Sequence, residues 1–148
     1  MSKISPEENK LDSTFGHWVK LQHSDFQGNA KCCTCGRYYS WDKLQAGHYR
    51  NRFDKATKYD ERNVHPQCIQ CNYFKSGAQV NHAEFINRKY GAGVSQELDR
   101  KAKMGVCQRK RYDFIFMENE YADKIRELLP SKSPEIQLKM KQYRRKKK

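Results

Sequence analysis

The sequence predicts an α+β domain in which a zinc ion staples a small core between an N-terminal helix and C-terminal helices. Two Cys-x-x-Cys motifs, Cys32/Cys35 and Cys68/Cys71, have the spacing of a closed four-cysteine zinc site. Apolar residues recur at helical spacing before the first motif and after the second. Between the motifs the pattern consists of short segments without helical spacing. Only 36% of the 148 residues are hydrophobic, so a bound metal would compensate for a small apolar core.

The first half of the chain predicts one helix and two strands. Residues 1–10 are polar and are expected to be flexible. The N-terminal helix follows, with its apolar face at Leu11, Phe15, Trp18 and Val19. The pattern then changes to short segments punctuated by the knuckles, and strands are expected at 38–41 and 44–50. We therefore expect a zinc-stapled domain over residues 11–91.

The second half predicts helices and a basic tail. The expected helices end at Gly91, Gly105 and Pro130, and they span residues 80–90, 94–104 and 112–129. Residues 92–130 thus form a helical extension. From residue 131 to residue 148 the sequence is rich in Lys and Arg, and such a run is expected to stay solvated until an anion neutralises it.

The cysteines leave two alternatives to the four-thiolate site. Gly36 allows the positive φ that a knuckle turn often requires, which favours Cys32 over Cys33 as the partner of Cys35. A register that uses Cys33 is the first alternative, and a pair of disulfides is the second. No signal peptide takes the chain to an oxidising compartment, which argues against disulfides. Cys107 has no partner at ligand spacing and is expected to be a small buried apolar residue.

The charge of the chain indicates a polyanionic partner. Thirty Lys and Arg against seventeen Asp and Glu give a formal net charge of +13. A surplus of this size favours nucleic acid over a small neutral substrate, and no apolar stretch is long enough for a membrane span. In the tail, Arg144, Arg145 and Lys146 are candidates for phosphate contacts.

Three residues between and after the knuckles fit the chemistry of phosphodiester hydrolysis. His48 has a side chain suited to a general base near neutral pH, and Gly47 before it would let a nucleic-acid backbone approach closely. Asn63 lies in the loop before the second knuckle, where its amide can fix the loop and align the histidine. Asn72, expected at the start of a short helix after Cys71, offers a hard oxygen ligand to Mg²⁺ or Mn²⁺.

These residues resemble the His-Asn-His/Asn (HNH) nuclease pattern, and more closely the phage NinG family, also called Rap. The likeness covers roughly residues 11–98. It rests on Leu11-Asp12-Ser13-Thr14-Phe15, Cys32 through Gly36, Gly47-His48-Tyr49, Tyr59 through His65, Gln67-Cys68, Cys71 through Ser76, and Lys89-Tyr90-Gly91. The resemblance implies a ββα-metal fold with His48 on the first strand, Asn63 in the connecting loop and Asn72 on the helix.

The same resemblance implies the roles of these side chains. His48 would activate water, Asn63 would orient its imidazole, and Asn72 would help hold one divalent ion. Many HNH nucleases carry a metal-binding Asp where this chain has Gly47, so the second protein ligand is open. Asp60 and His65 are the first substitutes, with Asp42 and Asp54 behind them. The cations expected to contact DNA near the site are Arg50, Arg52 and Lys75.

By resemblance, the protein is expected to be a Mg²⁺- or Mn²⁺-dependent endonuclease that cuts Holliday junctions and displacement loops in the cytoplasm of a phage-infected host. Symmetric incision of a four-way junction needs two active sites, which predicts a homodimer. Two other functions remain open: a non-catalytic zinc-knuckle protein that binds nucleic acid, and a phage assembly protein whose basic tail is incidental.

Overall fold

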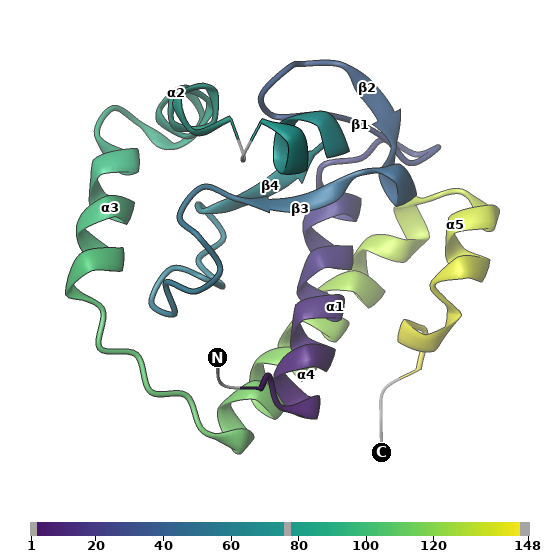
Figure 1. Ribbon diagram of the computed structural model, residues 1–148. Coiled ribbons are helices and arrows are strands. Elements are labelled where there is room, and N and C mark those ends of the chain that lie inside the picture. The colour runs from purple at the N-terminus through teal and green to yellow at the C-terminus, as the bar shows by residue number, and fades with distance from the viewer. Residues whose placement is uncertain (1–2, 76–77, 146–148) are drawn as a thin grey trace.

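A computed structural model describes residues 3–75 and 78–145 of the chain. Two long helices, α1 (Pro6–Gln22) and α4 (Arg111–Leu128), run side by side and form the base of a mixed α/β fold (Figure 1). The main apolar core lies between them and contains Leu11, Phe15, Trp18, Val19, Tyr121 and Ile125. The N-terminal helix and its buried face therefore confirm the sequence prediction, although α4 supplies the other half of this core.

Helix α1 begins earlier than predicted. Ser5 caps it by accepting a hydrogen bond of 3.1 Å from the Glu8 backbone N–H, and Pro6 occupies the first helical turn. Both residue types favour a helix start, because the serine satisfies an unpaired amide and proline has none to satisfy. The expectation that residues 1–10 are flexible is consequently wrong from Pro6 onward.

Two antiparallel hairpins cover one end of the α1/α4 pair. The first joins β1 (Asn29–Lys31) to β2 (Tyr38–Ser40), and the 3-10 turn η1 (Trp41–Lys43) leads into the second, which joins β3 (Gln45–His48) to β4 (Val64–Gln67). Strands β2 and β3 lie within the predicted strand segments. Strand β4 is fully buried although it contains Pro66, whose carbonyl accepts a hydrogen bond of 2.9 Å from the Cys33 N–H. Proline usually argues against a strand interior, which is why the sequence did not indicate β4.

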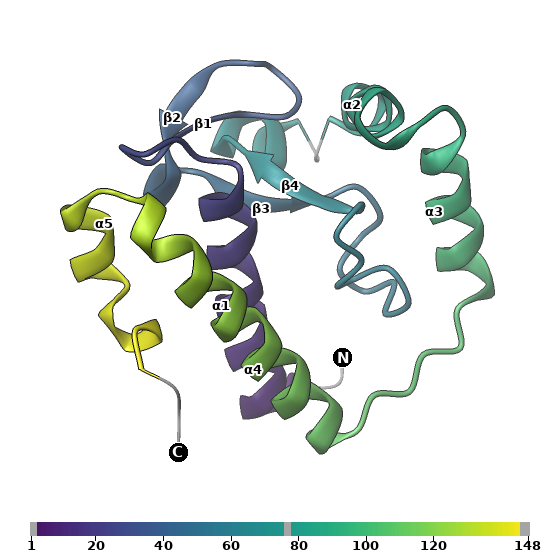
Figure 2. The same cartoon turned by 180° about the vertical axis from the view of Figure 1, so that it is seen from behind.

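Helices α2 (Gln79–Tyr90) and α3 (Val94–Met104) form the side of the molecule away from α5 (Pro134–Lys139), as Figure 2 shows. The π-helical turn η2 (Gln70–Phe74) follows β4 and precedes α2. Helices α2 and α3 pack with Tyr49 in a second small core that contains Ile86, Val94 and Leu98. The bounds of α2 and α3 agree with the predicted helices, including their ends at Gly91 and Gly105.

The beginning of the basic tail packs on the main core, contrary to the prediction. After η3 (Leu129–Ser131), the short helix α5 (Pro134–Lys139) and the turn η4 (Lys141–Tyr143) bury Ile136, Met140 and Tyr143 against α1 and α4. These three residues follow helical spacing on one face, and Ser133 caps α5 in front of Pro134. Arg144 and Arg145 are exposed, and Lys146 lies outside the described residues. No helix in the described part of the chain combines the length and the apolarity that crossing a bilayer requires.

Candidate functional site

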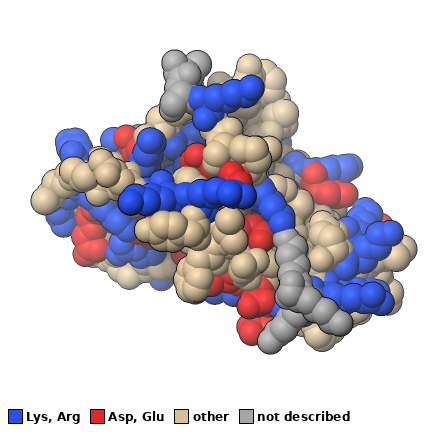
Figure 3. Space-filling model, turned by 90° about the horizontal axis from the view of Figure 1, so that it is seen from below, with Lys and Arg blue, Asp and Glu red and all other residues tan. Residues whose placement is uncertain are grey.

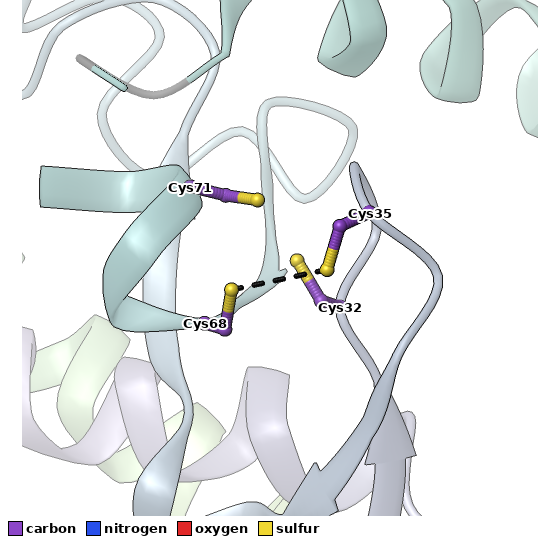
Figure 4. A group of neighbouring side chains, drawn as sticks. All are labelled: Cys32, Cys35, Cys68 and Cys71. Atoms are coloured by element: carbon purple, nitrogen blue, oxygen red, sulfur yellow. Dashed lines mark hydrogen bonds between the residues drawn. The ribbon is translucent and has the colours of Figure 1, made fainter. Parts of the chain in front are cut away.

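The sulfur atoms of Cys32, Cys35, Cys68 and Cys71 converge from the two knuckles, as Figure 4 shows. All four lie within 4.8 Å of one another, and the Cys35 and Cys68 sulfurs are 3.9 Å apart. Zinc–thiolate bonds of about 2.3 Å in a tetrahedron place sulfurs about 3.8 Å apart, so this group can hold a zinc ion. The register that uses Cys33 is therefore wrong, and so are the disulfides, because all six cysteines are free thiols.

Local geometry explains how each knuckle presents its thiols. Gly36 adopts a φ of 75°, and its N–H donates to the Cys32 carbonyl, which closes the turn between β1 and β2. On the other side, Cys68 directly follows β4 and Cys71 lies on η2. The only other apolar side chains packed with this cluster in the described part of the chain are Ala30 and Leu44, with Tyr39 and Ala78 partly buried against them. A metal is thus the main source of cohesion available to the segment.

The electrostatics of the thiols also call for a cation. Burial, together with the neighbouring sulfurs of Cys68 and Cys32, raises the pKa of Cys71 to about 12, whereas hydrogen bonds outweigh burial at Cys32 and lower its pKa to about 6. Burial also raises the pKa of Cys35. Four thiolates can form here together only with a cation between them, which is the condition that zinc satisfies. Cys107 is separate from the cluster and half-buried, so it is less enclosed than predicted.

A pocket of about 610 Å³ beside the cysteine cluster contains two of the three predicted catalytic residues, His48 and Asn72. His48 ends β3, and Asn72 lies inside η2 directly after Cys71 rather than at its start. The remaining lining residues are Gln45, Ala46, Asn51, Arg52 and Gln79. The cluster and β3 therefore bring an imidazole, an amide and a guanidinium to one cavity.

One ring nitrogen of His48 is held by the backbone. Its Nε2 lies 3.0 Å from the carbonyl oxygen of Lys58, so Nε2 must carry the proton and Nδ1 is left with a lone pair. Burial, followed by the positive charge of Arg52, lowers the pKa of His48 to about 4. At neutral pH the ring is accordingly neutral, with a proton acceptor at Nδ1.

Asn63 acts on the loop and not on the ring. It is fully buried, its Oδ1 accepts a hydrogen bond of 2.7 Å from the Arg50 N–H, and its Nδ2 donates to the carbonyls of Arg50 and Thr57. The loop between β3 and β4 is closed by these bonds, and Lys58 belongs to that loop. The prediction that Asn63 fixes the loop is therefore confirmed, while the hydrogen bond to the imidazole itself is made by the Lys58 carbonyl.

Asn72 presents an oxygen to the pocket. Its Nδ2 donates a hydrogen bond of 2.7 Å to Oε1 of Gln45 on β3. The Oδ1 atom thus remains available as a hard ligand for a cation. This cross-connection also ties η2 to β3, which fixes the two sides of the pocket relative to each other.

Neither substitute for the missing acidic ligand reaches the pocket. Asp60 is held by Arg62 and Lys101 at 3.0 and 2.8 Å; burial opposes its ionisation, but these hydrogen bonds lower its pKa to about 2. His65 is fully buried between His82 and Tyr90, with its two ring nitrogens 3.0 and 2.8 Å from their polar atoms. Both predictions are therefore wrong. The other two acids pair elsewhere: Asp42 with Lys139, and Asp54 with Arg50.

Gly47 serves a different purpose from the one expected. It is buried in β3, and a Cβ atom at this position would overlap the side chain of Gln67 on β4. Its small size is needed for the packing of the two strands, and it does not open the site to a nucleic-acid backbone. An aspartate at position 47 would have no room next to Gln67.

The side chains predicted to contact DNA differ in their exposure and in their ion pairs. Arg52 is exposed and lines the pocket, and Lys75 is exposed one residue beyond η2. Arg50 is engaged by Asp54 at 3.3 Å and Asp99 at 3.5 Å. Arg145 lines a separate groove of about 890 Å³ between α1 and α4. Figure 3 shows Lys and Arg distributed over one face with acids among them, so no single uninterrupted basic patch covers that face.

Comparison with known proteins places the chain in a family. The family model described as "Bacteriophage Lambda NinG protein" matches residues 3–130. The chain belongs to the NinG family. Curated NinG-family relatives include "Protein ninG" of Salmonella phage P22, 32% identical over 105 residues that make up 69% of this chain and 49% of that protein. "Protein ninG" of Escherichia phage lambda is 31% identical over 105 residues, which again make up 69% of this chain and 49% of that protein. "Protein ninG" of Escherichia phage 933W is 46% identical over 61 residues, which make up 38% of this chain and 29% of that protein.

The NinG match covers the whole region that forms the cysteine cluster and the pocket. The chain spans about half the length of the NinG proteins of phages P22 and lambda. No solved structure matches the chain.

Proposed function

We propose that this NinG-family protein is a metal-dependent endonuclease that cuts branched DNA. The observation that carries the proposal is the pocket in which His48 keeps Nδ1 available while Asn72 keeps Oδ1 available. The order of β3, the loop, β4 and η2 also follows the strand, strand and helix order that the HNH resemblance implies. A neutral, tautomerically fixed imidazole beside an oxygen ligand is what hydrolysis of a phosphodiester requires.

In the proposed reaction, each side chain of the pocket has a separate task. Nδ1 of His48 removes a proton from the attacking water, and the Lys58 carbonyl holds Nε2–H so that the ring faces the phosphate in one tautomer. Arg52 binds a phosphate oxygen through its guanidinium group. The resulting imidazolium lies next to this arginine, so its proton is released readily after the step.

The donor atoms of the pocket fit a hydrated Mg²⁺ or Mn²⁺ ion. Asn72, Gln45, Asn51 and Gln79 supply neutral amide oxygens, and the described lining residues include no carboxylate. Mg²⁺ keeps several water ligands in protein sites, so few protein ligands suffice. When bound, such an ion would stabilise the negative charge that develops on the phosphoryl and leaving oxygens.

Exposed aromatic side chains next to the pocket support branched DNA as the substrate. Phe53 follows Arg52 and is 72% exposed, while Tyr73 and Phe74 follow Asn72 and are 74% and 64% exposed. The rings of Tyr73 and Phe74 lie 5.1 Å apart and nearly perpendicular. Bases inside a linear duplex cannot reach such rings, whereas unpaired bases at a branch can stack on them. We further propose that two copies act together, because symmetric incision needs two sites related by a two-fold axis.

The test is incubation of the zinc-loaded protein with a four-way DNA junction and with a linear duplex of the same sequences, each with Mg²⁺, Mn²⁺ or a chelator. We expect strand cuts near the branch that require the divalent ion. Tight binding of the junction without any cut under these conditions would instead support the non-catalytic zinc-knuckle protein. Neither binding nor cutting would support an assembly role.

The aromatic pair gives a prediction about selectivity. In a protein that carries His48→Ala to prevent cutting, replacing Tyr73 and Phe74 with alanine should weaken binding of the junction about 10-fold, since stacking contributes about 1–3 kcal/mol per base. Binding of the linear duplex should change little. Fluorescence of 2-aminopurine placed at the branch measures the stacking directly. Phe26→Ala is the matched control, because Phe26 is also an exposed aromatic residue, at 58%, and does not line the pocket. Equal losses for the junction and the duplex would contradict the proposed stacking.

A further inference from the structure

The loop that holds His48 is fastened from outside by helix α1. Lys58 and Tyr59, in the loop between β3 and β4, are only 4% and 5% exposed. The Lys58 ammonium lies 3.0 Å from a carboxylate oxygen of Glu8 and 3.1 Å from one of Asp12, and the Tyr59 hydroxyl donates to the other oxygen of Asp12. Asp12 therefore binds two consecutive loop residues at once.

These contacts leave the loop little freedom. An ammonium group as buried as that of Lys58 costs several kcal/mol unless it is paired, so the loop must keep Lys58 against the two carboxylates. The ring of Tyr59 also packs edge-on against Phe15 of the same helix, with 5.5 Å between the ring centroids. The backbone of Lys58, which lies between these anchors, is thus held in one position.

We propose that Asp12 is a positioning residue for His48, acting through the Lys58 carbonyl that accepts the hydrogen bond from Nε2. The effect of Asp12 on cleavage rests on the proposed function. The chain of contacts from α1 to the imidazole is independent of that function. Asp12 belongs to residues 11–15, a segment of the family resemblance to which the pocket itself gives no role. Asn63 closes the two ends of the loop, and Asp12 secures its middle.

Charged groups around the imidazole shift the pKa of His48 in opposite directions. The positive charges of Arg52 and Lys58 lower the pKa of His48 after burial, while the negative charge of Asp12 raises it. His82 of α2 is close enough to His48 that the two rings influence each other electrostatically. Loss of the Asp12 charge should consequently move the pKa of His48 further down, in addition to releasing the loop.

The test is Asp12→Asn, read by ¹⁵N NMR of the imidazoles in metal-loaded protein without DNA. In the wild-type protein we expect one tautomer of His48, with the proton on Nε2. In the variant we expect a mixture of both tautomers and a lower pKa. Cleavage of the junction should fall roughly 10- to 100-fold in kcat with little change in KM, as for other residues that orient a reacting group through a neighbour.

The matched control is Glu7→Gln. Glu7 is another acid of α1, but it pairs with Arg111 of α4 at 2.7 Å and not with the loop. It should leave the His48 tautomer unchanged. The signals of the other four histidines serve as an internal reference for global changes in the fold.

A second variant guards against misfolding, because Asp12→Asn leaves Lys58 with one partner fewer. Tyr59→Phe keeps the ring in the core and removes a single bond to Asp12, so it should fold and shift the His48 tautomer in the same direction but by less. An unchanged tautomer in folded Asp12→Asn would overturn the proposal; if that variant does not fold, an unchanged tautomer in Tyr59→Phe would do so. Wild-type protein that does not cut DNA, together with a shifted tautomer in the variant, would refute the proposed nuclease but support the positioning role.

Discussion

Replacing His48 with alanine is expected to reduce junction cleavage about 10²- to 10⁴-fold, the usual contribution of a positioned general base. The neutral imidazole with an accepting Nδ1 disappears, and no other histidine lines the described part of the pocket. The fold should survive, because the loop stays closed through Asn63 and anchored through Asp12. Rates are measured under single-turnover conditions with excess protein, so that weak binding and slow chemistry are separated.

His17→Gln provides the control for this prediction. His17 lies on α1, where its ring contacts Trp41 and its Nδ1 lies 3.0 Å from the Tyr143 hydroxyl, away from the pocket. This variant should cut at close to the wild-type rate, and both variants should bind the junction alike. Wild-type cleavage by His48→Ala would show that another group activates the water.

Removing zinc is expected to unfold the segment that carries the pocket. The cluster is surrounded by few apolar side chains, so the metal supplies most of its stability. Zinc binding to such sites contributes about 10–16 kcal/mol, as much as the whole unfolding free energy of a typical domain. We expect about one zinc ion per chain by elemental analysis. Cys71→Ser or a strong chelator should lower and broaden the thermal transition seen by circular dichroism.

The matched control is Cys107→Ser, since Cys107 is a half-buried thiol outside the cluster. It should keep one zinc ion and a similar melting temperature. Helices α1 and α4 pack directly on each other, so they should retain part of their helical signal after zinc is removed. Folded, zinc-free protein with an intact transition would contradict a structural role for the metal.

Local patterns predicted the features that depend on neighbouring residues in the sequence. The two knuckles, the positive φ of Gly36 and helices α2 and α3 follow from spacing and glycine, and the structure confirms them. The start of α1 could also have been found, because Ser5 and Pro6 are common cap residues. The α5 segment was missed because its many charges concealed three apolar residues on one helical face.

Features that depend on contacts between residues far apart in the chain could not be predicted from the sequence. The partner of His48 is a backbone carbonyl, which every residue possesses, so nothing marked Lys58 in advance. Asp12 lies 46 residues from Lys58, and its role depends on how α1 meets the loop. Proximity in sequence wrongly suggested Asp60 and His65 as metal ligands. Their side chains are instead bound by other residues, Asp60 by Arg62 and His65 by His82.

The contact between Gly47 and Gln67 also bears on how such a site can change during evolution. Because an aspartate at position 47 would collide with Gln67 as it lies, the acidic version of this site also requires the Gln67 side chain to move. A shorter side chain at position 67 would provide the space. The two positions on paired strands are therefore epistatic, and relatives that gain the acid should differ at both.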